Sequence, residues 1–219
     1  MLYFAGPFLK ESERKELRKA LLLALEWEDG KNTATGSTKE IKKNIQLVRG
    51  ETYEKYSEYI INKIKSSNLI RNFAFPAKVF QILFTRTGSG MFYGTHVDLV
   101  FVGDKRRDLS FTIFLNDKND YKGGELVLYI PPEKRTIKLD AGQIIIYPTK
   151  YLHEVKKVTE GERMVCVGWI ESQVTSDDDR ELLGMIRKAQ GDFETSKITS
   201  STKLILNSVY NRLLKRFSS

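Results

Sequence analysis

The spacing of hydrophobic residues divides the chain into a helical beginning, a β-rich middle and a helical end. Near both ends, apolar residues recur every three or four positions, as they do on one side of an amphipathic helix. This spacing predicts helices over residues 12–27, 38–48, 51–65, 177–189 and 202–217. The polar stretch 190–201 is predicted to link the last two helices.

The middle of the chain has a different pattern. Short runs rich in Val, Ile, Phe and Tyr are separated by Gly, Pro and Asp, which is typical of strands and turns. The runs predict strands at 79–86, 92–102, 109–115, 125–130, 136–139, 143–147, 153–158 and 163–170. We therefore expect an α+β fold in which a β-sandwich or barrel of jelly-roll type is flanked by helices. Residues 1–175 would form the main domain, and residues 176–219 a helical extension packed on or beside it.

Composition narrows the class of protein. The chain has 219 residues, of which 41% are hydrophobic and 29% charged, so it can bury a core. A single cysteine, Cys166, excludes an internal disulfide framework and any cysteine-rich metal site. No apolar stretch approaches the ~20 residues of a membrane span, and the N-terminus lacks the basic residues of a signal peptide. We expect a cytoplasmic protein without a membrane partner.

The net charge of +8 raises the question of an anionic partner. Lys and Arg are interleaved with Glu and Asp along the predicted helices, and no long basic block occurs, so we expect no nucleic-acid partner. The apolar stripe of the last helix has two possible uses. It packs either on the chain's own core or on a second subunit, which leaves a homo-oligomer through the terminal helices open.

Histidine, the residue that most metal sites need, is present only as His96 and His153. On a strand, residues two apart point the same way, so His96 and Asp98 should lie side by side. His153 on a later strand would complete a set of two histidines and one carboxylate. That set suits a non-haem Fe(II) oxygenase, because it leaves coordination positions open. The competing interpretation is a chance His-x-Asp sequence with structural histidines.

An iron site of this kind needs a reductant such as a 2-oxo acid, whose distal carboxylate needs a cation. Arg163 begins the strand after His153, and a planar guanidinium binds a carboxylate through two hydrogen bonds. Val165, Val167 and Trp169 share its face of the strand and would form the pocket wall. The alternative is that Arg163 is an ordinary surface charge.

Several stretches together resemble a known family. They are Gly90–Asp98, Arg107–Asn116, Tyr121–Leu126, Leu139–Gly142, Tyr147–His153, Val158–Arg163 and Trp169–Ser172, with weaker matches at 27–30, 43–44 and 209–214. The chain thereby resembles the 2-oxoglutarate/Fe(II)-dependent oxygenases, and more closely the bacterial and phage PKHD-type hydroxylases, relatives of prolyl and lysyl hydroxylases. The resemblance covers nearly the whole chain.

The resemblance implies a double-stranded β-helix with Fe(II) at His96, Asp98 and His153, and with Arg163 binding 2-oxoglutarate. It also implies that O₂ is consumed, that 2-oxoglutarate is decarboxylated to succinate, and that a substrate C–H bond is hydroxylated. Ascorbate commonly keeps the iron reduced in such enzymes. A peptidyl proline or similar side chain is the favoured substrate and a small molecule the main alternative. A catalytically silent β-barrel that binds an anionic partner is the alternative of a different class.

The chain departs from the family at Thr87, where family members often carry a tyrosine that helps to hold 2-oxoglutarate. Tyr93 or Thr112 could take its place. Phe114 shares the strand face of Thr112 and is a further candidate for the pocket wall, although it could equally be a core aromatic.

One loop near the proposed site is strongly charged. Residues 103–108 contain Lys105, Arg106 and Arg107, which could attract an acidic substrate. An ordinary solvated loop explains the same residues.

Overall fold

The computed structural model describes residues 3–34, 36–194 and 199–218. Helices and strands follow one another as β1 (Phe4–Pro7), α1 (Glu11–Leu23), β2 (Trp27–Asp29), two short 3₁₀ helices (Gly30–Thr33 and Gly36–Lys39), β3 (Lys42–Lys43), β4 (Ile45–Leu47), α2 (Glu51–Ser66), α3 (Asn68–Ala74), β5 (Pro76–Gly88), β6 (Phe92–His96), β7 (Phe101–Val102), β8 (Lys105–Arg106), β9 (Leu109–Phe114), β10 (Tyr121–Gly123), β11 (Leu126–Ile130), β12 (Glu133–Ile137), β13 (Gln143–Pro148), β14 (Leu152–Val155), β15 (Val158–Ser172), α4 (Asp177–Glu194) and α5 (Ser200–Phe217).

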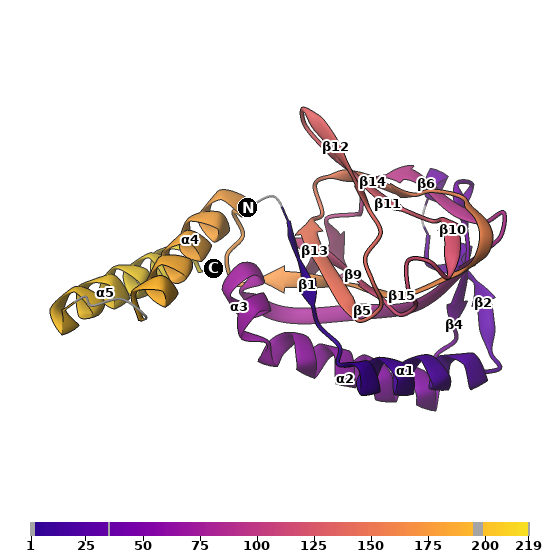
Figure 1. Ribbon diagram of the computed structural model, residues 1–219. Coiled ribbons are helices and arrows are strands. Elements are labelled where there is room, and N and C mark those ends of the chain that lie inside the picture. Colours follow the sequence, from indigo (N-terminus) through magenta and orange to yellow (C-terminus); the bar gives the residue numbers. More distant parts are fainter. Residues whose placement is uncertain (1–2, 35, 195–198, 219) are drawn as a thin grey trace.

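Two antiparallel sheets form the centre of the molecule. The larger has the strand order β1-β13-β9-β15-β5-β4-β2, with β10 pairing onto β15, and the smaller has the order β12-β11-β14-β6-β3. Neighbours in these orders are mostly distant in sequence, as expected when strands alternate between two facing sheets. The predicted jelly-roll core with flanking helices is confirmed (Figure 1).

The two faces of the larger sheet have different roles, which β9 illustrates. Leu109, Phe111 and Ile113 belong to the apolar core that includes residues of α1 and α2, the helices that lie across the outer face (Figure 1). Phe114 on the opposite face belongs to a second apolar cluster, with residues of both sheets. The polar residues Ser110 and Thr112, which share the face of Phe114, are buried and border a cavity between the sheets. Strand alternation therefore separates the structural core from the cavity.

The last two helices project from the β-rich body as a hairpin (Figure 1). A third, small apolar cluster of Phe75, Val174, Leu183 and Tyr210 joins them to the end of α3 and to the segment after β15. The boundary near residue 175 stays a prediction, supported by this separate cluster. None of the helices in the described ranges has the length and apolar character needed to cross a membrane.

The helix predicted over 38–48 is wrong. After a 3₁₀ turn, the chain forms the short strands β3 and β4, which pair with β6 and β5. The apolar positions fit a helical spacing, but the buried residues of this stretch are Lys42, Gln46 and Leu47, and Lys42 and Gln46 border the cavity. Pairing with β6 and β5 satisfies the backbone hydrogen bonds of these short strands.

Other predicted boundaries also shift. The strand predicted over 92–102 ends at His96, so Asp98 lies beyond it. The break predicted at 159–162 is absent. The short strand β10 pairs with this stretch, and β15 runs without interruption from Val158 to Ser172. Helix α3 lies in a stretch for which no helix or strand was predicted, and Ser67 at its start accepts a hydrogen bond from Ile70 N. Helix α4 continues to Glu194, into the predicted linker, whose residues 195–198 lie outside the described ranges.

Candidate metal centre

The two histidines lie directly opposite each other on neighbouring strands of the smaller sheet. His96 ends β6 and pairs with His153 on β14, and their ring centroids are 4.3 Å apart. His96 Nδ1 lies 2.8 Å from Gly94 O, and His153 Nδ1 lies 3.0 Å from Tyr151 O. A carbonyl oxygen only accepts, so each Nδ1 carries a proton, and in the neutral form of each ring the lone pair is on Nε2. Such outer contacts orient histidines for metal binding.

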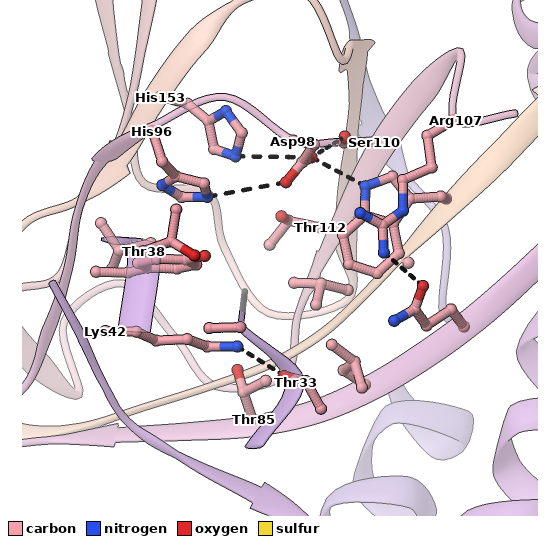
Figure 2. A pocket seen from close by; sticks show the side chains of 18 of the residues that line it. Thr33, Thr38, Lys42, Thr85, His96, Asp98, Arg107, Ser110, Thr112 and His153 are labelled. Carbon is pink, nitrogen blue, oxygen red and sulfur yellow. Dashed lines mark hydrogen bonds and ion pairs between the residues drawn. The ribbon is translucent and has the colours of Figure 1, made fainter. Parts of the chain in front are cut away.

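Asp98 comes to the same point from the loop after β6. Its two oxygens each lie 3.8 Å from a histidine nitrogen, Oδ1 from His96 Nε2 and Oδ2 from His153 Nε2 (Figure 2). Ser110 Oγ and Trp169 Nε1 both donate to Oδ2, at 2.7 and 2.9 Å. The larger sheet therefore holds the carboxylate against the histidines of the smaller sheet.

One ligand atom from each of the three side chains lies within 4.8 Å of the other two. An ion about 2 Å from each ligand would separate them by roughly 3–4 Å, so this set fits a divalent metal after a small contraction. The protonation states also fit. Burial, followed by the neighbouring His153, lowers the pKa of His96 to about 4, so its ring is neutral at pH 7. Burial raises the pKa of Asp98, but His153 and the hydrogen bonds from Ser110 and Trp169 outweigh it and leave the pKa below its usual value.

Arg163 borders the same cavity from β15, where its side chain is only 3% exposed. Its guanidinium lies 5.4 Å from the Phe114 ring, and its Nε has no hydrogen-bond partner among the described residues. Burial lowers the pKa of Arg163, while Tyr121 and Tyr147 oppose the shift. No carboxylate in the described part of the chain lies within ion-pair distance of it. A buried cation without an anion fits a ligand that brings its own carboxylate.

The cavity has a volume of about 600 Å³ and is bordered by most of the predicted site residues. These are His96, Asp98, His153, Arg163, Thr112, Tyr93, Val167 and Trp169. Tyr93 stacks on His96, with ring centroids 3.7 Å apart. Phe114 and Val165 do not border the cavity directly but lie in the apolar cluster between the sheets, against which Arg163 rests.

Lys42 and Tyr147 also border the cavity, and neither was predicted from the sequence to belong to the site. Strand alternation could have found Tyr147, because it follows Ile145 on the inner face of β13. Lys42 was assigned to the predicted helix that is wrong. Arg107, one of the three basic loop residues that could attract an acidic substrate, does border the cavity. Its neighbour Arg106 instead binds Asp108 at 2.7 Å, outside the cavity.

Comparison with known proteins gives independent information on the family. The profile of the 2OG-Fe(II) oxygenase superfamily matches residues 81–171. A PKHD-type hydroxylase from Prochlorococcus marinus strain MIT 9515 is 51% identical over 158 residues, 72% of each chain. A PKHD-type hydroxylase from strain MIT 9313 is 39% identical over 216 residues, 97% of each chain.

Solved structures agree on the fold. A prolyl-4-hydroxylase from Pseudomonas putida matches with a TM-score of 0.56 at 18% identity, covering 78% of this chain and 92% of its own. A prolyl hydroxylase from Trichoplax adhaerens, in complex with a hypoxia inducible factor peptide fragment, matches with a TM-score of 0.57 at 16% identity, covering 83% and 86%. The family of these enzymes uses Fe(II) and 2-oxoglutarate, and the chain has a His-Asp-His set. From its close relatives, the chain belongs to the PKHD-type hydroxylases of the 2OG-Fe(II) oxygenase superfamily and is a hydroxylase of the dioxygenase class.

Proposed function

We propose that this enzyme hydroxylates a substrate C–H bond while 2-oxoglutarate and O₂ are converted to succinate and CO₂. One oxygen atom enters the new hydroxyl group and the other enters succinate. The main support for the proposal is that two groups border one cavity between the sheets. They are the converging side chains of His96, Asp98 and His153, and the buried cation Arg163, whose Nε has no hydrogen-bond partner among the described residues.

Each residue has a defined role in this proposal. His96, Asp98 and His153 hold Fe(II), which when bound supplies the activation of O₂. Arg163 binds the distal carboxylate of 2-oxoglutarate, and its burial strengthens the hydrogen bonds because water is excluded. Phe114, Val165 and Trp169 form the apolar support: the first two lie behind Arg163, and Trp169 lies beside the metal ligands.

A tyrosine replaces the one missing at Thr87. Thr87 pairs with Arg163 across β5 and β15, but its side chain is short. Tyr147 is buried, and its pKa is raised well above the usual value by burial and by Asp98, while Arg163 opposes the shift. Tyr147 borders the same cavity as Asp98 and Arg163. We add Tyr147 to Tyr93 and Thr112 as a group that holds 2-oxoglutarate.

A peptidyl proline or similar side chain remains the favoured substrate, supported by the prolyl hydroxylases among the structures of similar fold. A small-molecule substrate is the alternative. Use of ascorbate, a cytoplasmic location and oligomerisation through the terminal helices also stay predictions. Exposed apolar residues on α4 and α5 support the last of these: Leu182, Met185, Leu204, Ile205 and Val209.

The decisive experiment is anaerobic addition of Fe(II) and 2-oxoglutarate, followed by visible absorption. A weak charge-transfer band is expected in the wild type and should be absent in His153→Ala. Glu154→Gln is the matched control, because Glu154 is next in sequence but binds Tyr129 rather than Asp98. Absence of the band in the wild type would refute the proposal. Succinate release over proline-containing peptides and a metabolite panel then identifies the substrate.

A further inference from the structure

Two more buried cations border the cavity, and the proposed chemistry uses neither. Lys42 is 5% exposed and Arg107 is 8% exposed. In Figure 2 they extend toward the space below His96 and Asp98 from opposite sides. The two are far apart in sequence and lie on different elements, so the fold brings them to one cavity.

Among the residues that the structure describes, Lys42 makes side-chain polar contact only with a neutral group. Its Nζ donates to Thr33 Oγ1 at 2.8 Å and lies 5.2 Å from the Tyr93 ring centroid. No carboxylate in the described ranges lies within ion-pair distance. Burial lowers the pKa of Lys42 to about 8, Asp98 and Asp29 oppose this shift, and Arg107 adds to it. A bound anion would relieve the cost of burying this charge.

Arg107 is held rigidly, also by neutral groups. Its guanidinium stacks on Trp169 at 3.9 Å from the ring centroid, and its Nη2 donates to Gln81 Oε1 at 2.5 Å. Its Nε has no hydrogen-bond partner among the described residues. Gln81 has a φ of 53°, a left-handed conformation that is rare for a residue other than glycine, at an irregularity in the pairing of β5 with β15. This backbone conformation places the Gln81 side chain where it accepts the hydrogen bond from Arg107 at the cavity.

The other charged groups of the cavity cannot neutralise this pair once the site is loaded. Asp98 is the carboxylate whose charge both Lys42 and Arg107 feel, and the proposed function assigns it to the metal. The co-substrate's distal carboxylate is likewise assigned to Arg163. Two positive charges thus remain on the substrate side of the cavity without a compensating anion.

We propose that the substrate of this enzyme carries an anionic group, a carboxylate or a phosphate, that binds between Lys42 and Arg107. The inference rests on the proposed function, because it assumes that the metal and 2-oxoglutarate occupy the other groups. The cavity rim adds a second requirement. Val97, Leu99 and Phe101 line it and are 48%, 54% and 61% exposed, so the rest of the substrate has an apolar surface.

The test uses calorimetric binding to the full chain loaded anaerobically with Fe(II) and 2-oxoglutarate. The probes are matched pairs: N-acetylproline with its amide, Asp- with Asn-containing prolyl peptides, and phosphoserine- with serine-containing prolyl peptides. We expect at least one acid to bind about tenfold or more tightly than its neutral partner. Lys42→Met and Arg107→Gln should each remove most of that ratio. Lys43→Met, which alters the exposed neighbour of Lys42, should retain it.

Two results would overturn the inference. In the first, no acid binds more tightly than its neutral partner. In the second, the ratio of acid to neutral affinity is unchanged in both Lys42→Met and Arg107→Gln. The inference would also be overturned if both variants lost affinity for 2-oxoglutarate as much as for the acids. That result would mean that Lys42 and Arg107 bind the co-substrate. Thermal unfolding and the charge-transfer band show whether each variant is folded and loaded. A wild-type band without any preference for acids refutes this inference alone, whereas a missing wild-type band refutes the proposed function.

Discussion

Trp169 Nε1 donates a hydrogen bond of 2.9 Å to Asp98 Oδ2, across 71 residues of sequence. Asp98 lies outside any strand, so strand geometry alone does not direct its carboxylate toward the histidines. Trp169 and Ser110, on adjacent strands of the larger sheet, perform that function. The contact therefore couples the two sheets at the proposed metal centre.

Removing this donor should weaken metal binding. In Trp169→Phe the aromatic ring remains but the N–H is lost, and we expect the affinity for Fe(II) to fall about 10- to 100-fold, as for other outer-sphere contacts to metal ligands. Anaerobic titration with Fe(II) in the presence of 2-oxoglutarate measures the change. Trp27→Phe is the control, since the Trp27 indole donates to Ala24 O instead. Equal affinities in the two variants would contradict the role of Trp169.

Arg163 should govern the requirement for 2-oxoglutarate. Arg163→Ala removes the buried cation, and we expect the KM for 2-oxoglutarate to rise about 100-fold or more, because charge-assisted bonds in a buried site are lost. Succinate release at varied 2-oxoglutarate measures this. The control is Arg86→Ala on the neighbouring strand, where the side chain pairs with Glu162. Unchanged 2-oxoglutarate affinity in Arg163→Ala would exclude the assignment.

Gly124 should be needed to seat Arg163. A Cβ at this position would lie 3.2 Å from Arg163 Cδ and 3.0 Å from Tyr121 Cε2, and its φ is +66°. Gly124→Ala is expected to lose about 2–4 kcal/mol of unfolding free energy and to raise the KM for 2-oxoglutarate.

Gly90→Ala separates backbone strain from steric contact as causes of the lost unfolding free energy. Gly90 has a φ of +79°, but an added Cβ would meet no atom within 4 Å. It should therefore lose only about 1–2 kcal/mol from backbone strain and leave the KM for 2-oxoglutarate unchanged. Equal losses in urea denaturation would mean that the contact with Arg163 is unimportant.

Lys42 should reduce the stability of the unliganded protein. Its pKa is about 8 when folded and 10.5 ordinarily, so between these values the folded chain binds fewer protons than the unfolded chain. The contribution of Lys42 to the unfolding free energy therefore increases as the pH rises from 8 to 10.5. Below pH 8 the folded chain bears the full free-energy cost of burying the charged amine. We expect Lys42→Met to be more stable than wild type by roughly 1–3 kcal/mol at pH 7, after loss of the Thr33 bond.

The difference in unfolding free energy between the two proteins should shrink toward about pH 10, because Lys42 is then already neutral in the folded chain and begins to lose its proton in the unfolded chain as well. Urea denaturation at both pH values measures it. Other alkaline titrations affect both proteins alike and cancel in the difference. A less stable Lys42→Met at pH 7 would show that Lys42 serves mainly as a structural partner of Thr33.

Local patterns were sufficient for much of the site. Two histidines in the whole chain left few ways to build a metal site, and strand alternation placed Arg163, Val167 and Trp169 on one face. The failures have a physical cause. Asp98 was assigned to a strand that ends at His96, and Lys42 to a helix, because short apolar runs fit either period when the pairing partner is unknown.

By itself, the sequence determined the class of fold, the flanking helices and the residue types of the proposed metal centre, because periodicity and composition are local properties. Tertiary structure decided which groups meet. It set His153 opposite His96 and oriented Asp98 through Trp169. It also buried Arg163, Lys42 and Arg107 around one cavity, where none of the described carboxylates forms an ion pair with them. Burial and pairing depend on contacts between distant strands, and only the folded chain contains those contacts.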